Sequence, residues 1–152
     1  MFNMNGEVVG IVSYILSQSG GFEGLGFAAT SKVARELLID RNPFYLGIDG
    51  TAIGSEIAGI FNLPQSSGFL VQKVVFLSPA GMMGLRGGEY KGTIEGQEIV
   101  LGGDIILAID DIEFSFQNLE AISDRFNELK KGDSFSLKIM RQGKIMTLTG
   151  RI

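Results

Sequence analysis

The sequence predicts a mainly β protein with added α-helices (an α+β fold): one small, partly open β-barrel with two helices, preceded by a two-stranded unit. Three observations lead to this prediction. Short β-branched and apolar runs separated by glycine recur after residue 43, two stretches place apolar residues at helical spacing, and another pair of apolar runs precedes them. The 152 residues, 45% of them hydrophobic, suffice for one domain of about 100 residues plus an appendage.

The N-terminal part, residues 1–41, is expected to form its own small unit. Residues 7–15 and 25–29 are apolar runs joined by a glycine-rich loop, which predicts a hairpin-like pair of strands. Thr30 or Ser31 offers an N-cap oxygen for a following helix of roughly three turns that ends before Pro43. The apolar positions of that helix are Val33, Ala34, Leu37 and Leu38.

The remainder, residues 42–152, is expected to be the complete domain. Its five β-like runs are FYLGI, SGFLVQKVVFL, GDIILAIDDIEF, DSFSLKIM and KIMTLTGRI. The pairs Asp110-Asp111 and Gln142-Gly143 stand between such runs and predict tight hairpin turns. Residues 85–103 hold six glycines and few large apolar residues, so this stretch is too loose to add a layer to the core, and we interpret it as a surface insertion that can fold into a small hairpin.

Two helical segments interrupt the strands. A short helix is expected around residues 79–85. A longer helix is expected over residues 118–130 and should lie over the opening of the barrel. Its apolar positions, three and four residues apart, are Leu119, Ile122, Phe126 and Leu129.

Composition excludes several classes of function. With 13 basic and 17 acidic residues, a net charge of -4 and no basic stripe, we expect no nucleic-acid partner. The absence of histidine removes the usual general base of serine and cysteine hydrolases, and the absence of cysteine removes a thiol nucleophile. No apolar run approaches the ~20 residues of a membrane-spanning helix. The chain alone is therefore not expected to be an enzyme.

No cofactor or metal is expected either. The glycine clusters around residues 21–26 and 84–88 match neither phosphate-binding pattern, so loop flexibility explains them better. The acids Asp104, Asp110, Asp111 and Glu113 do not have the spacing of a calcium-binding loop, and we interpret them as solvated turn acids.

The order of elements along the whole chain resembles the C-terminal part of HtrA/Deg-type, trypsin-like serine proteases. Residues 2–38 are similar to the stretch that directly follows the nucleophile segment in that family. The resemblance implies that the strand containing Val12, Ser13 and Tyr14 pairs with substrate, and that Gly26 and Phe27 border the primary specificity pocket. It also implies that the catalytic residues lie upstream and that the compartment is periplasmic or extracytoplasmic.

The second half, from Tyr45 onward, resembles the PDZ domain of these proteases, on the strength of the runs SPAGMMGLRGG and LGGDIILAIDD. PDZ domains bind the C-terminus of another chain as an added strand at a sheet edge. Their carboxylate-binding loop has an apolar-Gly-apolar pattern, because glycine lets backbone N–H groups approach an anion closely.

Two stretches of the sequence match that loop pattern. The GLGF at residues 24–27 precedes only a brief strand and a helix, so it lacks an edge strand long enough for a groove. The better candidate is the loop Tyr45, Leu46, Gly47 and Ile48, followed by an edge strand over residues 49–53 that includes Asp49 and Gly50. In an alternative interpretation, FYLGI is an ordinary core strand with a bulge at its glycine.

The opposite wall of the expected groove is the longer helix, in which Leu119, Ile122 and Phe126 divide between core and groove. Expected partners are hydrophobic C-terminal peptides or unfolded protein segments, and Gly47→Leu should weaken binding while leaving the fold nearly intact. Two alternatives stay open: the chain is part of an active endopeptidase of protein quality control, or its N-terminal strands form a homo-oligomer.

Overall fold

The computed structural model describes residues 1–16, 25–36, 45–94 and 96–151. The chain divides into two compact units, Met1–Pro43 and Phe44–Ile152. The division falls two residues beyond the boundary expected from sequence, within a stretch outside the described residues. Each unit is described by itself.

The N-terminal unit is built on a two-stranded antiparallel sheet, as the apolar runs predict. Strand β1 (Gly10–Leu16) pairs with β2 (Leu25–Thr30). Helix α1 (Ser31–Arg35) begins where the Thr30 hydroxyl oxygen accepts a hydrogen bond from the Val33 N–H at 3.3 Å, so Thr30 is the N-cap of the two candidates that the sequence offers. The expected continuation of this helix through Leu37 and Leu38 lies outside the described residues.

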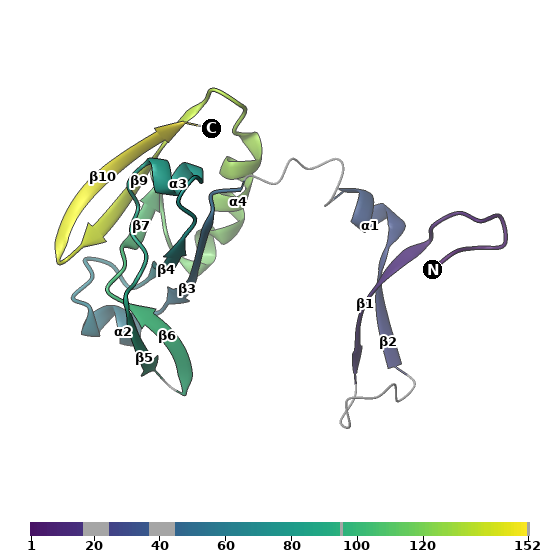
Figure 1. Cartoon of the computed structure of the whole chain (residues 1–152), viewed down its shortest axis with the longest axis horizontal. Coiled ribbons are helices and arrows are strands. Elements are labelled where there is room, and N and C mark those ends of the chain that lie inside the picture. Colours follow the sequence, from purple (N-terminus) through teal and green to yellow (C-terminus); the bar gives the residue numbers. More distant parts are fainter. Residues whose placement is uncertain (17–24, 37–44, 95, 152) are drawn as a thin grey trace. The chain divides into compact units, whose positions relative to one another are not determined.

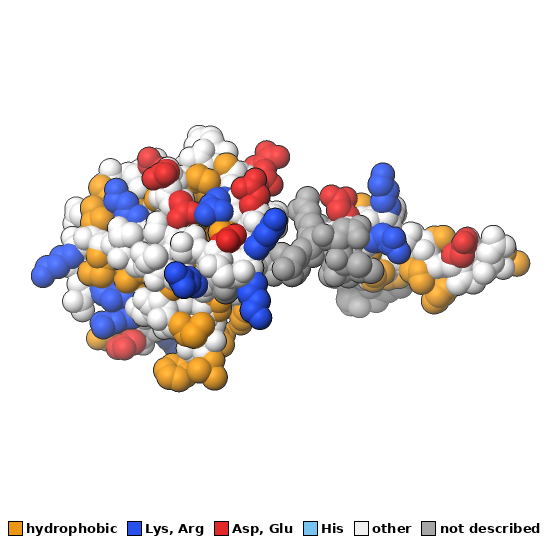
Figure 2. Space-filling view, turned by 90° about the horizontal axis from the view of Figure 1, so that it is seen from above, with side chains coloured by type: hydrophobic (Ala, Val, Ile, Leu, Met, Phe, Trp, Pro, Cys, Tyr) orange, Lys and Arg blue, Asp and Glu red, His pale blue; other side chains and the backbone are white. Residues whose placement is uncertain are grey.

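Apolar side chains of this unit reach the surface, as Figure 2 shows in orange. Val12 is 62% exposed and Phe27 43% exposed. Among the residues of this unit whose exposure is described, which leave out 14–16 and 25, only Gly10 is buried. A two-stranded sheet of this kind has no core of its own.

The C-terminal unit is an open, antiparallel six-stranded sheet rather than a closed barrel (Figure 1). Along the sheet the strands follow the order β10-β9-β7-β4-β3, and the short β8 pairs with β7. The fold class expected from sequence is confirmed. The strand bounds are β3 (Ile48–Ile53), β4 (Gly68–Val74), β7 (Ile105–Ile109), β8 (Ile112–Glu113), β9 (Ser134–Arg141) and β10 (Lys144–Arg151).

Strand β7 lies at the centre of the sheet, and all five of its residues are buried. Its continuous apolar run, IILAI, is typical of a strand covered on both faces. Alternate residues accordingly belong to two core clusters: Ile106 packs with Leu137 and Ile122, whereas Ile105 and Leu107 pack with residues of the opposite face.

Both expected hairpin turns are confirmed. Asp110 and Gln142 adopt left-handed backbone conformations, each with φ of 49°, and Gly143 has φ of 75°. These residue types tolerate the left-handed conformations that two-residue hairpin turns require.

In the described part of this unit three α-helices and one 3-10 helix accompany the strands, although the sequence predicts only two helices. Helices α3 (Pro79–Met82) and α4 (Leu119–Glu128) occupy the expected positions, and a 3-10 turn, η2 (Phe116–Asn118), leads into α4. Helix α2 (Ser55–Ile60) was missed because six residues that include Gly59 give too short a periodic pattern. None of the helices in the described ranges is long and apolar enough to cross a membrane.

The glycine-rich stretch forms a hairpin of β5 (Tyr90–Ile94) and β6 (Gln97–Leu101). The small hairpin expected for this stretch is confirmed, and it also contributes to the core. Ile99 is 7% exposed and packs in the cluster that contains Leu70 and Leu107. One apolar residue facing the sheet from a short strand is enough to extend the core.

Candidate functional site

The loop at residues 45–47 precedes β3 and takes its shape from Gly47, which has φ of 78°. Residues 45–47 form no strand and β3 begins only at Ile48, so for the described residues the alternative that FYLGI is an ordinary core strand with a bulge at its glycine is wrong. The loop carbonyls bond inward: the Leu46 oxygen accepts from the Ala80 N–H at 3.1 Å, and the Gly47 oxygen from the Val75 N–H at 2.9 Å.

The N–H groups of this loop are left available. Neither the Leu46 nor the Gly47 N–H donates a hydrogen bond to any residue within the described ranges. The carbonyl groups of Leu46 and Gly47 accept hydrogen bonds and fix the conformation of the loop. The N–H groups of the same two residues are then adjacent donors that a ligand can use. Such an arrangement suits an anion.

Ser78 holds the loop against α3. Its hydroxyl donates to the Val75 carbonyl at 2.6 Å and accepts from the Gly81 N–H at 3.2 Å, which caps the helix. Its side chain also lies where a Cβ on Gly47 would have to be. The loop therefore requires glycine both for its φ value and for space.

Strand β3 ends the sheet and pairs only with β4 among the described strands. The pairing has an irregularity between Asp49 and Gly50, where a Cβ on Gly50 would collide with the Leu70 carbonyl. Outside this bulge, the free side of β3 offers backbone groups to which an extended chain can add.

An apolar cavity of about 150 Å³ lies between the start of β3 and α4. The loop contributes Leu46, β3 contributes Ile48, and α4 contributes Ile122 and Phe126. All lining residues are apolar: Leu46, Ile48, Phe69, Ile106, Ile109, Phe114, Ile122, Phe126 and Leu137. The structure thus brings together four of the residues that the sequence singles out.

The three helix positions divide between core and surface. Ile122 is 7% exposed and belongs to the core cluster, while Phe126 is half-buried and meets Phe135 edge-on at a ring distance of 6.2 Å. Leu119 is 44% exposed and does not line the cavity.

The other loop and strand residues expected at the site lie outside the cavity. Tyr45 is exposed, as is Asp49, whose carboxylate is 3.9 Å from the Lys73 ammonium. Gly50 lies at the bulge.

Five lining residues were missed by sequence reasoning. Phe69, Ile106, Ile109, Phe114 and Leu137 come from the sheet and the segment after β8. The sequence gives a partial signal for these residues. The unbroken apolar run of β7 indicates a central strand, and the residues of such a strand and of its neighbours line any cavity on the covered face of the sheet.

The positions expected to contact substrate in the N-terminal unit are brought together by the register of β1 and β2. Tyr14 is opposite Phe27, and a bulge falls between Val12 and Tyr14, at Ser13. Gly26 is opposite Ile15.

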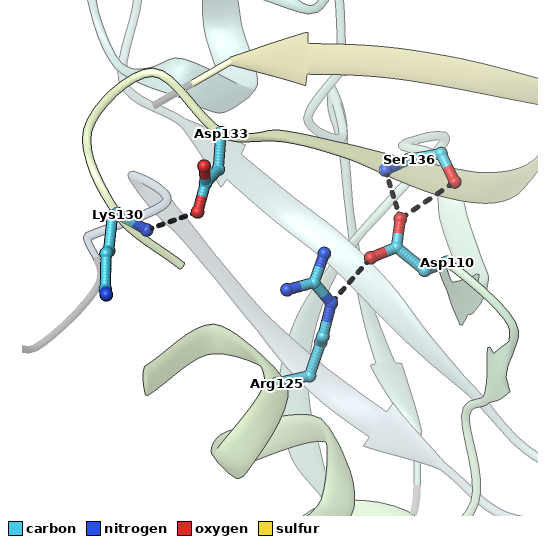
Figure 3. A network of polar contacts seen from close by, with 5 residues as sticks. All are labelled: Asp110, Arg125, Lys130, Asp133 and Ser136. Carbon is cyan, nitrogen blue, oxygen red and sulfur yellow. Dashed lines mark hydrogen bonds and ion pairs between the residues drawn. The ribbon is translucent and has the colours of Figure 1, made fainter. Parts of the chain in front are cut away.

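A polar network fixes the flank of α4, as Figure 3 shows. The Asp110 carboxylate accepts hydrogen bonds from the Ser136 N–H at 2.7 Å, the Ser136 hydroxyl at 3.1 Å and the Arg125 Nε at 2.8 Å. Partial burial by itself would raise the pKa of Asp110, but the hydrogen bonds from Ser136 and Arg125 outweigh it and hold the pKa below its usual value.

A second ion pair lies away from the cavity. Arg141 donates to both carboxylate oxygens of Asp104, at 2.7 Å each, and to the Gly84 carbonyl at 2.7 Å. The hydrogen bonds to Asp104 raise the pKa of Arg141 and outweigh the opposing effect of burial. Asp104 is 1% exposed, so its interpretation as a solvated turn acid was wrong, and the ion pair with Arg141 balances its charge within the protein.

Comparison with known proteins identifies relatives along nearly the whole chain, although no family model matches. Proteins named "Probable periplasmic serine endoprotease DegP-like" are 31% identical in a Marinomonas species over 98% of this chain, and 33% identical in Pseudomonas putida over 97%. A protein of that name from Chlamydia trachomatis is 32% identical over 97%. The chain spans only 28–29% of the length of these relatives.

Solved structures agree with these relatives. The HtrA-type protease AlgW with a decapeptide matches 96% of this chain and 42% of its own, with a TM-score of 0.57 and 28% identity. The same protease with a tripeptide matches 99% of this chain and 46% of its own, with a TM-score of 0.54 and 27% identity.

Proposed function

We propose, since this chain matches the HtrA-type serine proteases as a C-terminal fragment of them, that its C-terminal unit is a PDZ module that captures the hydrophobic C-termini of other protein chains. The captured chain adds as a strand along β3. Its terminal carboxylate meets the N–H groups of Leu46 and Gly47, and its last side chain enters the cavity between β3 and α4.

The observation that carries this proposal is the alignment of three features along one edge. Two adjacent backbone donors without a partner in the described ranges stand next to an apolar cavity, and both stand at the start of an edge strand. The N–H groups suit a carboxylate, and the edge strand suits a peptide backbone.

The cavity favours an aliphatic or aromatic terminal side chain. A polar side chain there would be buried without a hydrogen-bond partner, because every lining residue is apolar. Solved HtrA-type relatives carry a tripeptide or a decapeptide, which supports peptides as the ligand class.

The experiment is a fluorescence anisotropy titration of the whole chain with labelled peptides that end in Val, Leu, Phe, Ser or Asp. The best binder is then repeated as its C-terminal amide. We expect apolar termini to bind best, and the amide to bind at least about tenfold more weakly because it lacks the charge that the loop holds. Equal affinity for the acid and the amide would contradict the binding of the terminal carboxylate by the loop N–H groups.

We infer that peptide cleavage, which the names of the relatives report, is not an activity of these 152 residues alone. The chain contains no histidine and therefore no imidazole to activate a serine. In a longer protein, this module would hold or sense substrates of a catalytic unit. Hydrolysis of casein by the purified chain would overturn this inference.

The relatives are named periplasmic proteases, and we extend a periplasmic or extracytoplasmic location to this chain. Fractionation of the native host, with the chain recovered in the cytoplasm, would contradict it.

A second candidate function is self-association through the N-terminal strands. Ile11 and Val12 of β1 are 47% and 62% exposed on a sheet of only two strands. We expect light scattering to report a dimer or larger species that Val12→Lys reduces. A monomer at all concentrations would rule this function out.

A further inference from the structure

The two walls of the cavity are held together differently. Strand β3 is hydrogen-bonded to β4 along its length, whereas α4 belongs to no sheet and is positioned by its side chains. Ile122 of α4 and Leu129, the residue that follows the helix, are buried in the core cluster and anchor the helix on the sheet. Apolar packing of this kind is not directional, so it leaves the helix some freedom to slide.

The Asp110 network supplies a directional contact. Asp110 lies in the turn after β7, Ser136 in β9 and Arg125 in α4, so one carboxylate joins two strands of the sheet to the helix (Figure 3). The side chains of Arg125 and Asp110 are 30% and 26% exposed, which limits screening of the pair by solvent.

All three members of this network are chain neighbours of residues that line the cavity. Ile109 precedes Asp110, Phe126 follows Arg125, and Leu137 follows Ser136, and all three neighbours are lining residues. A shift of Arg125 therefore moves Phe126. None of the three network residues itself lines the cavity.

We propose that Asp110 is a positioning residue of the peptide groove: by holding Arg125 against β9 it sets the distance between α4 and β3, and hence peptide affinity, without touching the ligand. This inference rests on the proposed function of the groove. Peptide affinity then also depends on Asp110, which contacts the flank of α4 that carries Arg125 and not the flank that carries Leu119.

The test compares Asp110→Asn, Arg125→Gln and the double variant in peptide titrations of the whole chain. Each single variant should weaken binding of the best acid-terminated peptide by about fivefold, and the double variant should be no weaker than either, since one shared contact is lost. Arg125→Lys, which keeps the charge, should recover part of the affinity. Additive losses, or no loss, would overturn the proposal.

Asp133→Asn is the matched control. The Asp133 carboxylate also accepts a backbone hydrogen bond near the end of α4, from the Lys130 N–H at 2.9 Å, but neither residue is a chain neighbour of a lining residue (Figure 3). Its peptide affinity should stay within about twofold of the unsubstituted chain. An equal loss in this variant would mean that general loosening of the helix, and not the Asp110 contact, controls the groove.

Amide hydrogen exchange of the free chain separates this inference from the proposed function. Asp110→Asn should increase exchange across residues 122–126 of α4 by about tenfold, while Asp133→Asn should not. If the unsubstituted chain binds no peptide, the proposed function fails, and the exchange data still decide whether Asp110 holds the helix. Unchanged exchange in Asp110→Asn would overturn the positioning role even if peptides bind.

Discussion

The side chain of Ser78 fills the space that a Cβ on Gly47 would need. Gly47 also has a left-handed backbone with φ of 78°. Residues other than glycine are therefore disfavoured at this position for two independent reasons, the steric collision and the backbone conformation. The loop that leads into β3 is therefore fixed by a contact 31 residues away along the chain.

Gly47→Ala should destabilise the fold, by about 2–4 kcal/mol, because it combines backbone strain with a steric collision. This corrects the expectation that Gly47→Leu leaves the fold nearly intact. Urea unfolding of both variants would measure the loss. Ser78→Ala, which removes the cap of α3, provides the control and should cost about 1 kcal/mol. Wild-type stability in Gly47→Ala would contradict the geometry of the loop.

Ile122→Val should change peptide preference. Removing one methylene from the cavity wall enlarges the cavity, so peptides ending in Phe should gain affinity relative to those ending in Val. The stability cost should be about 1 kcal/mol. The same change at Ile57, which packs in the opposite core cluster, should leave the ratio of affinities unaltered. If Ile57→Val changed this ratio of affinities as well, the cavity would not be the source of the preference for the terminal side chain.

The stability provided by Asp110 should depend on pH. Its pKa in the folded chain lies below the ordinary value of 3.8, so its contribution is present above about pH 5 and is lost as the pH falls through the folded pKa. Urea unfolding at pH 7 should show Asp110→Asn to be less stable than the unsubstituted chain. The gap should shrink at pH 3, and a gap that stays constant would show that charge at Asp110 contributes nothing.

Arg141→Leu should be among the more damaging single substitutions in this unit. It would leave the Asp104 carboxylate buried without its cationic partner, which costs about 3–5 kcal/mol. Lys73→Gln breaks an ion pair whose side chains are 74% and 71% exposed, and it should change stability by no more than about 0.5 kcal/mol. Similar unfolding midpoints for the two variants would contradict this ranking.

Sequence reasoning located the elements whose signals are local. Hairpin turns at Asp110 and Gln142, the cap at Thr30 and the apolar spacing of α4 each depend on a few adjacent residues, and all four appear in the structure. The short helix α2 was not predicted, because six residues that include a glycine carry little periodic signal.

Part of the cavity lining was predicted from sequence. The loop at residues 45–47, Ile48 and two positions of α4 could be named because glycine and helical spacing leave a pattern. The contacts that shape the groove were out of reach, because the pairing of Gly47 with Ser78 and of Arg125 with Asp110 depends on tertiary structure. For the same reason, sequence alone did not show that Leu119 lies outside the cavity.

The central claim is that the N–H groups of Leu46 and Gly47 hold the carboxylate of a bound chain. Backbone amide NMR of the whole chain, titrated with one apolar peptide as its free acid and as its C-terminal amide, tests this claim most directly. The acid should shift the Leu46 and Gly47 amide resonances strongly downfield as it saturates, since a charged acceptor polarises the N–H bond. If the acid binds and shifts residues of β3 and α4 while these two amides stay in place, the carboxylate lies elsewhere and the account is wrong.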